Sequence, residues 1–106
     1  MIKFKRGDVV IVDLGMVAKS RPGVVVSIAR PDSQRNMSII VPISTEIRNG
    51  ETEIPLGKVP WLRQESVIQL LWIRGVDNAK IEHNITTLNP DIFRKVEDGL
   101  ARILGL

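Results

Sequence analysis

Apolar runs of strand type follow one another through most of the chain and predict a mainly β protein. They are rich in Val and Ile, and polar or turn-forming segments separate them. The first two runs contain no polar residue, which is typical of strands buried on both faces. In chain order the predicted strands are Val9–Val12, Val24–Val26, Met37–Ile43, Glu51–Leu56, Ser66–Ile73 and a weaker Ile85–Leu88.

Turn-forming residues indicate how these strands connect. Asn49-Gly50 favours a hairpin turn between the third and fourth runs. Pro42 lacks a backbone N–H, so it predicts an edge strand or the last turn of the third strand. Arg74-Gly75 is expected to close the fifth strand, and a helical turn capped by Asp77 or Asn78 is expected to follow.

The C-terminal segment has the pattern of an α-helix. Asn89 is a suitable N-cap, Pro90 suits the first helical position, and Gly105 marks the end. Gly99 lies on or beside the apolar stripe, where it permits close packing against a sheet. Short strands followed by one helix predict a small, strongly bent antiparallel sheet or barrel on which the helix docks. The stripe consists of Ile92, Phe93, Val96, Leu100, Ile103 and Leu104.

Composition fits one small globular domain spanning residues 1–106, with 43% hydrophobic and 25% charged residues. Only 4% are aromatic, so the core must be mostly aliphatic. We expect Trp61 to pack at one end of the barrel rather than to bind a base. No apolar run is long enough for a signal peptide or a membrane span, so a cytoplasmic protein without a membrane partner is expected.

Two features limit the chemistry that the chain can perform. The absence of cysteine excludes disulfides, thiolate catalysis and cysteine-based zinc sites. His83 is the only histidine, and its neighbours Glu82 and Asn84 predict a solvated side chain rather than a metal ligand. We therefore predict no zinc site and no histidine-rich metal site. A net charge of +3 permits an anionic partner without requiring one.

Arg21 is the first candidate for a functional residue. Pro22 biases it towards extended geometry, and the apolar run that follows anchors it in the sheet. A guanidinium held in this way can bind a phosphate through two parallel hydrogen bonds. The alternative is an ordinary surface arginine at a strand start. Lys19 and Ser20 precede it in the first loop that could meet a ligand.

Polar residues also follow the third strand, where a scaffold can hold them at fixed positions. Ser44, Thr45 and Glu46 lie there, although an ordinary hydroxyl-rich loop would have the same composition.

Trp72 has two interpretations, which depend on the face it occupies. Strand alternation places it on the same side as Leu70 and opposite Leu71 and Ile73, with Gln69 on the side of Leu71. An outward Trp72 near Arg74 could stack a nucleic-acid base. With the opposite parity, or at a dimer seam, it is a packing residue.

Several short motifs, in this order and spacing, resemble the MazF/PemK toxins nearly end to end. The motifs are Gly7-Asp8-Val9-Val10 with Val12-Asp13-Leu14, Arg21-Pro22 before Val24–Ser27, Ile40–Thr45, Ser66-Val67 and Arg74–Asp77. The resemblance implies an SH3-like barrel of about five to seven mostly antiparallel strands with a C-terminal helix packed on it. It further implies a homodimeric, metal-independent endoribonuclease that cuts single-stranded mRNA without a cofactor and is silenced by a cognate antitoxin. We expect that antitoxin to be acidic.

The resemblance also assigns roles to residues. Arg21 matches the arginine that stabilises charge on the phosphorane, and Ser44 and Thr45 match the paired catalytic hydroxyls. Where relatives often carry an acidic residue and glutamine, this chain has Leu71-Trp72. The residues expected to bind substrate are Lys19, Ser20, Glu46, Gln69, Trp72 and Arg74.

Two other functions remain open at this point. One is a catalytically weak or dead member that binds RNA or the antitoxin. The other is a related barrel toxin that poisons DNA gyrase through its C-terminal residues and has no nuclease activity. Leu104-Gly105-Leu106 carries no aromatic residue to insert into such a partner, and the pairing of Arg21-Pro22 with Ser44-Thr45 is the nuclease pattern.

Overall fold

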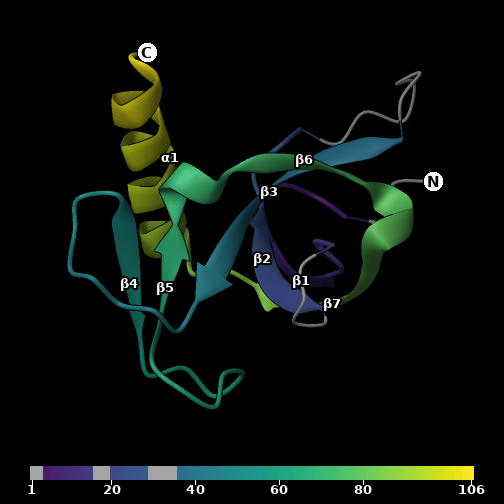
Figure 1. The fold of residues 1–106 in the computed structure, drawn as a ribbon, viewed down its shortest axis with the longest axis horizontal. Helices are drawn as coiled ribbons and strands as arrows, with labels where there is room; N and C mark the ends of the chain where they lie inside the picture. Colours follow the sequence, from purple (N-terminus) through teal and green to yellow (C-terminus); the bar gives the residue numbers. More distant parts are fainter. Residues whose placement is uncertain (1–3, 16–19, 29–35) are drawn as a thin grey trace.

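The computed structural model describes residues 4–15, 20–28 and 36–106. Within these ranges seven strands form one sheet in the order β4-β5-β3-β2-β1-β7, and β6 also pairs with β3 (Figure 1). No helix in them has the length and apolar character needed to cross a membrane. The strands are β1 (Asp8–Val12), β2 (Arg21–Val25), β3 (Met37–Ser44), β4 (Glu53–Gly57), β5 (Ser66–Gln69), β6 (Arg74–Asp77) and β7 (Ile81–Thr87); the helices are the 3-10 turns η1 (Leu70–Trp72) and η2 (Asn78–Lys80) and the α-helix α1 (Pro90–Leu104).

The strand β3 organises the sheet because it changes partner halfway along one edge. Met37–Ile40 pairs with β6, and Ile43-Ser44 pairs with β5. Its other edge pairs with β2, where Gly23 lies opposite Pro42. Pro42 is buried and β3 has partners on both edges, so the prediction of an edge strand is wrong, whereas Pro42 does lie near the end of β3. On the partner-changing edge it falls between the two ladders, where a residue without an N–H is tolerated.

Each face of the sheet buries its own apolar core. On one face, α1 covers a cluster to which alternate residues such as Val9, Val24 and Val41 contribute. On the other face, Val10, Val25 and Ile40 meet Val76 of β6 and Ile81 of β7. The buried strands β1 and β2 thus confirm the prediction from their uninterrupted apolar runs. In the described residues no ladder joins β6 to β7, so the SH3-like barrel is not closed.

The helix α1 begins and ends as predicted. The Asn89 side chain accepts hydrogen bonds from the N–H groups of Asp91 and Ile92, and Gly105 ends the helix with φ 72°. The helix packs on β4 and η1. A Cβ at Gly99 would lie 2.5 Å from Leu70 Cδ1, so the absent side chain does permit the close approach to the sheet.

The predicted hairpin at Asn49-Gly50 is wrong. Asn49 does turn the chain, with φ 58°, but β4 does not return along β3. It pairs instead with the far edge of β5, with Ile54 opposite Ile68. The strand β5 thus lies between β3 and β4, and the turn residues alone do not specify which strand the returning segment joins.

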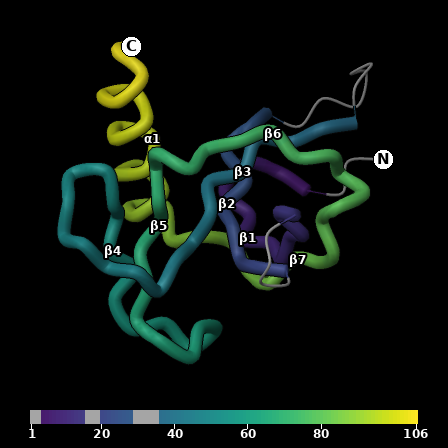
Figure 2. The backbone as a smooth tube through the Cα atoms, viewed as in Figure 1, coloured from purple at the N-terminus to yellow at the C-terminus, as the bar shows by residue number. Residues whose placement is uncertain are grey.

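The predicted strand Ser66–Ile73 is correct only up to Gln69. The next residues form η1, in which the Ile73 N–H donates to the Leu70 carbonyl. Arg74-Gly75 then begins β6 instead of closing a strand. The turn η1 carries the chain away from β3 after β5, and β6 pairs with β3 again at its other half. Figure 2 shows this crossing beside α1.

The segment between β6 and α1 contains the two elements that were predicted there, and its strand is longer than predicted. The expected helical turn is present as η2, and the Asp77 carboxylate caps it by accepting from Ala79 N–H at 2.9 Å. The weak strand expected at Ile85–Leu88 is the end of the longer β7. Trp61 packs against the core covered by α1, as expected, and His83 is exposed.

We expect Gly23→Ala to destabilise the fold by about 1–3 kcal/mol, the usual effect of overpacking a core. A Cβ there would lie 2.5 Å from Ile40 Cγ2, a stiff β-branched side chain, and 3.4 Å from the Val41 carbonyl. Urea denaturation measures the change. Gly50→Ala is the control, because nothing lies within 4 Å of its Cβ position. Equal stability of both variants would contradict the tight β2–β3 approach.

Candidate functional site

The ladder between β2 and β3 brings Arg21 and Ser44 to the same end of the sheet. Val24 pairs with Val41 and Gly23 with Pro42. This ladder ends at Gly23 and Pro42, and Arg21, the first residue of β2, and Ser44, the last residue of β3, lie just beyond it. Arg21 pairs with Val12 of β1, and Ser44 pairs with Val67 of β5.

Arg21 carries an unsatisfied donor. Its side chain is half-buried, and its Nε has no hydrogen-bond partner among residues 4–15, 20–28 and 36–106. A buried donor without a partner costs about 1–3 kcal/mol. An anion bound to the guanidinium would remove that cost. The Arg21 guanidinium is therefore suited to donate to a bound anion.

Ser44 is buried, and its environment fixes the direction of its hydroxyl. The Oγ accepts a hydrogen bond from the Glu46 N–H at 3.0 Å. The hydroxyl proton stays available for donation, since a serine oxygen can accept and donate at once. Thr45 is the next residue and is exposed. The exposed Glu46 carboxylate pairs with Arg48 at 3.5 Å, a surface contact of small energetic weight.

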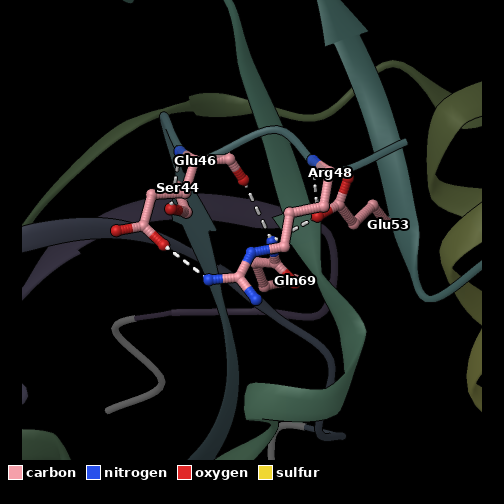
Figure 3. A network of polar contacts seen from close by, with 5 residues as sticks. All are labelled: Ser44, Glu46, Arg48, Glu53 and Gln69. Carbon is pink, nitrogen blue, oxygen red and sulfur yellow. Dashed lines mark hydrogen bonds and ion pairs between the residues drawn. The ribbon is translucent and has the colours of Figure 1, made fainter. Parts of the chain in front are cut away.

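A buried carboxylate that the sequence did not indicate lies behind Ser44. Glu53 is 7% exposed and accepts hydrogen bonds from the N–H groups of Arg48 and Asn49 and from Gln69 Nε2 (Figure 3). Burial raises its pKa, but these hydrogen bonds together outweigh burial and lower the pKa below the usual glutamate value. The only sequence signal was a carboxylate inside a strand-type run.

Gln69 was expected to bind substrate, and the structure places it in this network. Its side chain is buried, and its Nε2 also donates to the Glu46 carbonyl at 3.3 Å. Ser20 was given the same role; its hydroxyl donates to the Glu82 carboxylate on β7. Lys19 lies outside the described residues.

A hollow of about 450 Å³ opens beside Pro42 of β3, two residues before Ser44. Leu14, Pro42, Trp72 and Arg74 line it. Pro42 shares its face of β3 with Ser44, and Leu14 follows β1, whose Val12 pairs with Arg21. An apolar floor with a cation at the rim suits a flat, hydrophobic ring.

Trp72 is 43% exposed at this hollow, but the alternation argument for its position is wrong. Leu70 is fully buried while Trp72 is exposed, so the two do not share a side. Leu71 is 62% exposed and does not lie on the core-facing side with Gln69. The alternation of a strand does not apply here, because Leu70, Leu71 and Trp72 belong to η1.

Within the described ranges, no three His, Cys, Asp or Glu side chains gather closely enough to hold a metal ion.

Comparison with known proteins points to one family and one fold. The family described as "PemK-like, MazF-like toxin of type II toxin-antitoxin system" matches residues 5–104. MazF from Deinococcus radiodurans has a TM-score of 0.82 at 16% identity, covering 98% of each chain. Mycobacterium tuberculosis toxin MazF-mt6 has a TM-score of 0.78 at 21% identity, covering 93% of this chain and 97% of its own.

A third structure is an endoribonuclease from a mycobacterial species in complex with its cognate antitoxin. It has a TM-score of 0.81 at 23% identity, covering 97% of this chain and 96% of its own. At these identities the likeness establishes a shared fold, and it confirms the predicted mainly β architecture with a C-terminal helix.

We expect the hydrogen bonds to Glu53 to contribute stability that is lost in acid. Because its pKa is lower in the folded chain, this contribution is complete above the ordinary glutamate value of about 4.3 and disappears as pH falls through the lowered pKa. Glu53→Gln should be less stable than the wild type at pH 7, and the difference should shrink towards pH 3. Urea denaturation across this range measures it.

Glu51→Gln is the matched control for this experiment, since Glu51 is exposed and lies two residues away. A stability difference for Glu53→Gln that stays constant with pH would show that the carboxylate is not held ionised by the fold.

Proposed function

Because the chain belongs to the PemK-like, MazF-like toxins of type II toxin-antitoxin systems, we propose that it is a metal-independent endoribonuclease that cleaves single-stranded messenger RNA. Cleavage of cytoplasmic mRNA would make it the growth-inhibiting toxin of its pair. The observation that carries this proposal is the buried, unpartnered Nε of Arg21 on the strand beside Ser44.

The chemistry needs no nucleophile from the protein. The RNA's own 2′-hydroxyl gives its proton to water and attacks the adjacent phosphorus. The bond to the 5′-oxygen breaks and that oxygen takes up a proton from water, so a cyclic phosphate and a 5′-hydroxyl result. Arg21 would donate hydrogen bonds to the phosphorane oxygens as negative charge develops there. One such preorganised donor is worth about 3–4 kcal/mol.

Ser44 and Thr45 supply the remaining donors in this mechanism. Because the Ser44 Oγ already accepts from Glu46 N–H, its proton is directed away from that bond and can reach the phosphate or the 2′-oxygen. Arg21 provides the positive charge beside them. DNA lacks the attacking hydroxyl, so it would bind without being cut.

The hollow beside Pro42 supports binding of a base. Trp72 would stack the base that flanks the cut phosphate, and Arg74 would contact its phosphate or its ring. Leu14 and Pro42 would form the apolar floor. Glu46, exposed directly after the paired hydroxyls, would lie beside the bound strand.

The proposal includes two protein partners. An acidic cognate antitoxin would bind the chain, whose net charge is +3, and the complex of the mycobacterial endoribonuclease with its antitoxin is a precedent for such an assembly. A second copy would form a homodimer. Exposed apolar side chains such as Met37 and Ile39, at 47% and 43%, offer surface that a dimer would cover.

We expect Arg21→Ala to lower RNA cleavage by at least ~100-fold, as for the loss of one preorganised phosphate donor. The assay maps the cut ends of a long single-stranded RNA in EDTA, where the wild type should leave a cyclic phosphate or 3′-phosphate and a 5′-hydroxyl. Arg94→Ala, an exposed arginine on α1, is the control. Full activity of Arg21→Ala would refute the assignment, and an inactive wild type would favour a binding-only or gyrase-directed protein.

We expect Trp72→Ala to weaken binding of a non-cleavable RNA by about 5–150-fold, the equivalent of ~1–3 kcal/mol of base stacking. The RNA carries 2′-deoxy sugars at the cut site, and fluorescence anisotropy measures binding. Leu71→Ala is the control, since Leu71 is the exposed neighbour on the same turn. If sedimentation or melting shows that Trp72→Ala dissociates or unfolds, with affinity falling only in step, Trp72 is a packing residue.

A further inference from the structure

The backbone of Glu46, two residues after Ser44, is held by two hydrogen bonds. Its N–H donates to Ser44 Oγ at 3.0 Å, and its carbonyl accepts from Gln69 Nε2 at 3.3 Å. The first bond restrains the serine rotamer. The second holds the peptide group that follows, so Gln69 restrains the Glu46 backbone from which the bond to Ser44 is made.

Gln69 in turn is fixed by Glu53, its direct partner across the β4–β5 ladder. Its Nε2 donates to Glu53 Oε2 at 2.8 Å, and the same carboxylate accepts from Arg48 N–H at 3.0 and 3.2 Å and from Asn49 N–H at 3.0 Å. A buried carboxylate persists only where such donors satisfy it. The loop after Ser44 is therefore tied to the sheet through two buried polar side chains (Figure 3).

Gln69 and Glu53 lie in the interior, unlike the exposed residues that follow Ser44. Gln69 and Glu53 are 8% and 7% exposed, whereas Thr45 and Glu46 are exposed. The strand β5 also holds Ser44 directly, because its Val67 pairs with that residue. One strand thus supports both the serine and the Glu46 backbone that orients it, and neither Gln69 nor Glu53 needs to contact RNA to affect the reaction.

We propose that Glu53 and Gln69 are positioning residues that hold the Ser44 hydroxyl in its productive direction through the backbone of Glu46. This inference rests on the proposed nuclease function. A purely structural anchor would affect stability and leave the activity of the folded protein unchanged. A positioning pair affects the rate of the chemical step and acts through Ser44.

The decisive variant is Gln69→Met, which keeps the approximate size of the side chain and removes both donor bonds. Glu53→Gln is the second variant, because it keeps an acceptor for the loop N–H groups while removing the charge. Glu51→Gln is the control on the exposed residue of the same segment. Each is assayed well below its own melting temperature, so that only folded protein is compared.

We expect Gln69→Met to lower kcat by about 10–100-fold, the scale of effect that small misplacements have, while the Kd for the non-cleavable RNA changes less than ~2-fold. In a Ser44→Ala background the same substitution should have no further effect on kcat, because the residue it positions is gone. Hydrogen exchange at the amides of Glu46, Arg48 and Asn49 should accelerate in Gln69→Met and Glu53→Gln.

Each reverse outcome overturns the inference. An unchanged kcat in an active enzyme, equal losses with and without Ser44, or unaltered amide exchange would each reduce the pair to a structural anchor. An inactive wild type would overturn the proposed nuclease function, and with it positioning for cleavage. The exchange measurement is independent of activity and separates a loop that is not held from a protein that does not cut.

Discussion

The change of partner along β3 is the constraint on which the rest of the structure depends. One strand serves two ladders, with β6 along its first half and β5 along its last two residues, while β2 pairs with its opposite edge. The sheet must bend at this point, and each half then encloses its own core. Consecutive residues Ile40 and Val41 of β3, which point to opposite faces, are accordingly both buried, and the Ile40 side chain fills the space beside Gly23.

This bend also explains why the candidate site lies where it does. Beyond the end of the β2–β3 ladder the apolar core gives way to polar side chains, and there Arg21 is held by its pairing with Val12 of β1 and Ser44 by its pairing with Val67 of β5. Hydrogen-bonded strands hold side chains more precisely than a free loop can. The segment that does leave the sheet, after Ser44, is tied back through the buried Glu53 and Gln69.

Local patterns predicted those parts of the fold that local physics determines. The apolar runs of β1 and β2, the Asn89 cap and the Asp77 turn all follow from neighbouring residues. The pairing of β4 with β5 and the end of the strand before Leu70 could not be predicted in this way. An apolar run indicates that a segment is buried, but it does not indicate which strand the segment pairs with or where the strand ends. Short sequence motifs identified Arg21 and Ser44 as candidates. Glu53 could not be identified from the sequence, because its role depends on hydrogen bonds with Gln69 and with the loop before β4 that only the folded structure brings together.

The sheet order also determines which strands are available to an incoming chain. In the described residues β4, β6 and β7 each have an edge that pairs with no other strand, where an extra strand could add with the attendant risk of aggregation. Pro55 in β4 lacks the N–H that an added strand would need, and Glu82, His83 and Asn84 give β7 an exposed polar surface. The two strands at the ends of the sheet order thus discourage uncontrolled growth of the sheet into fibres.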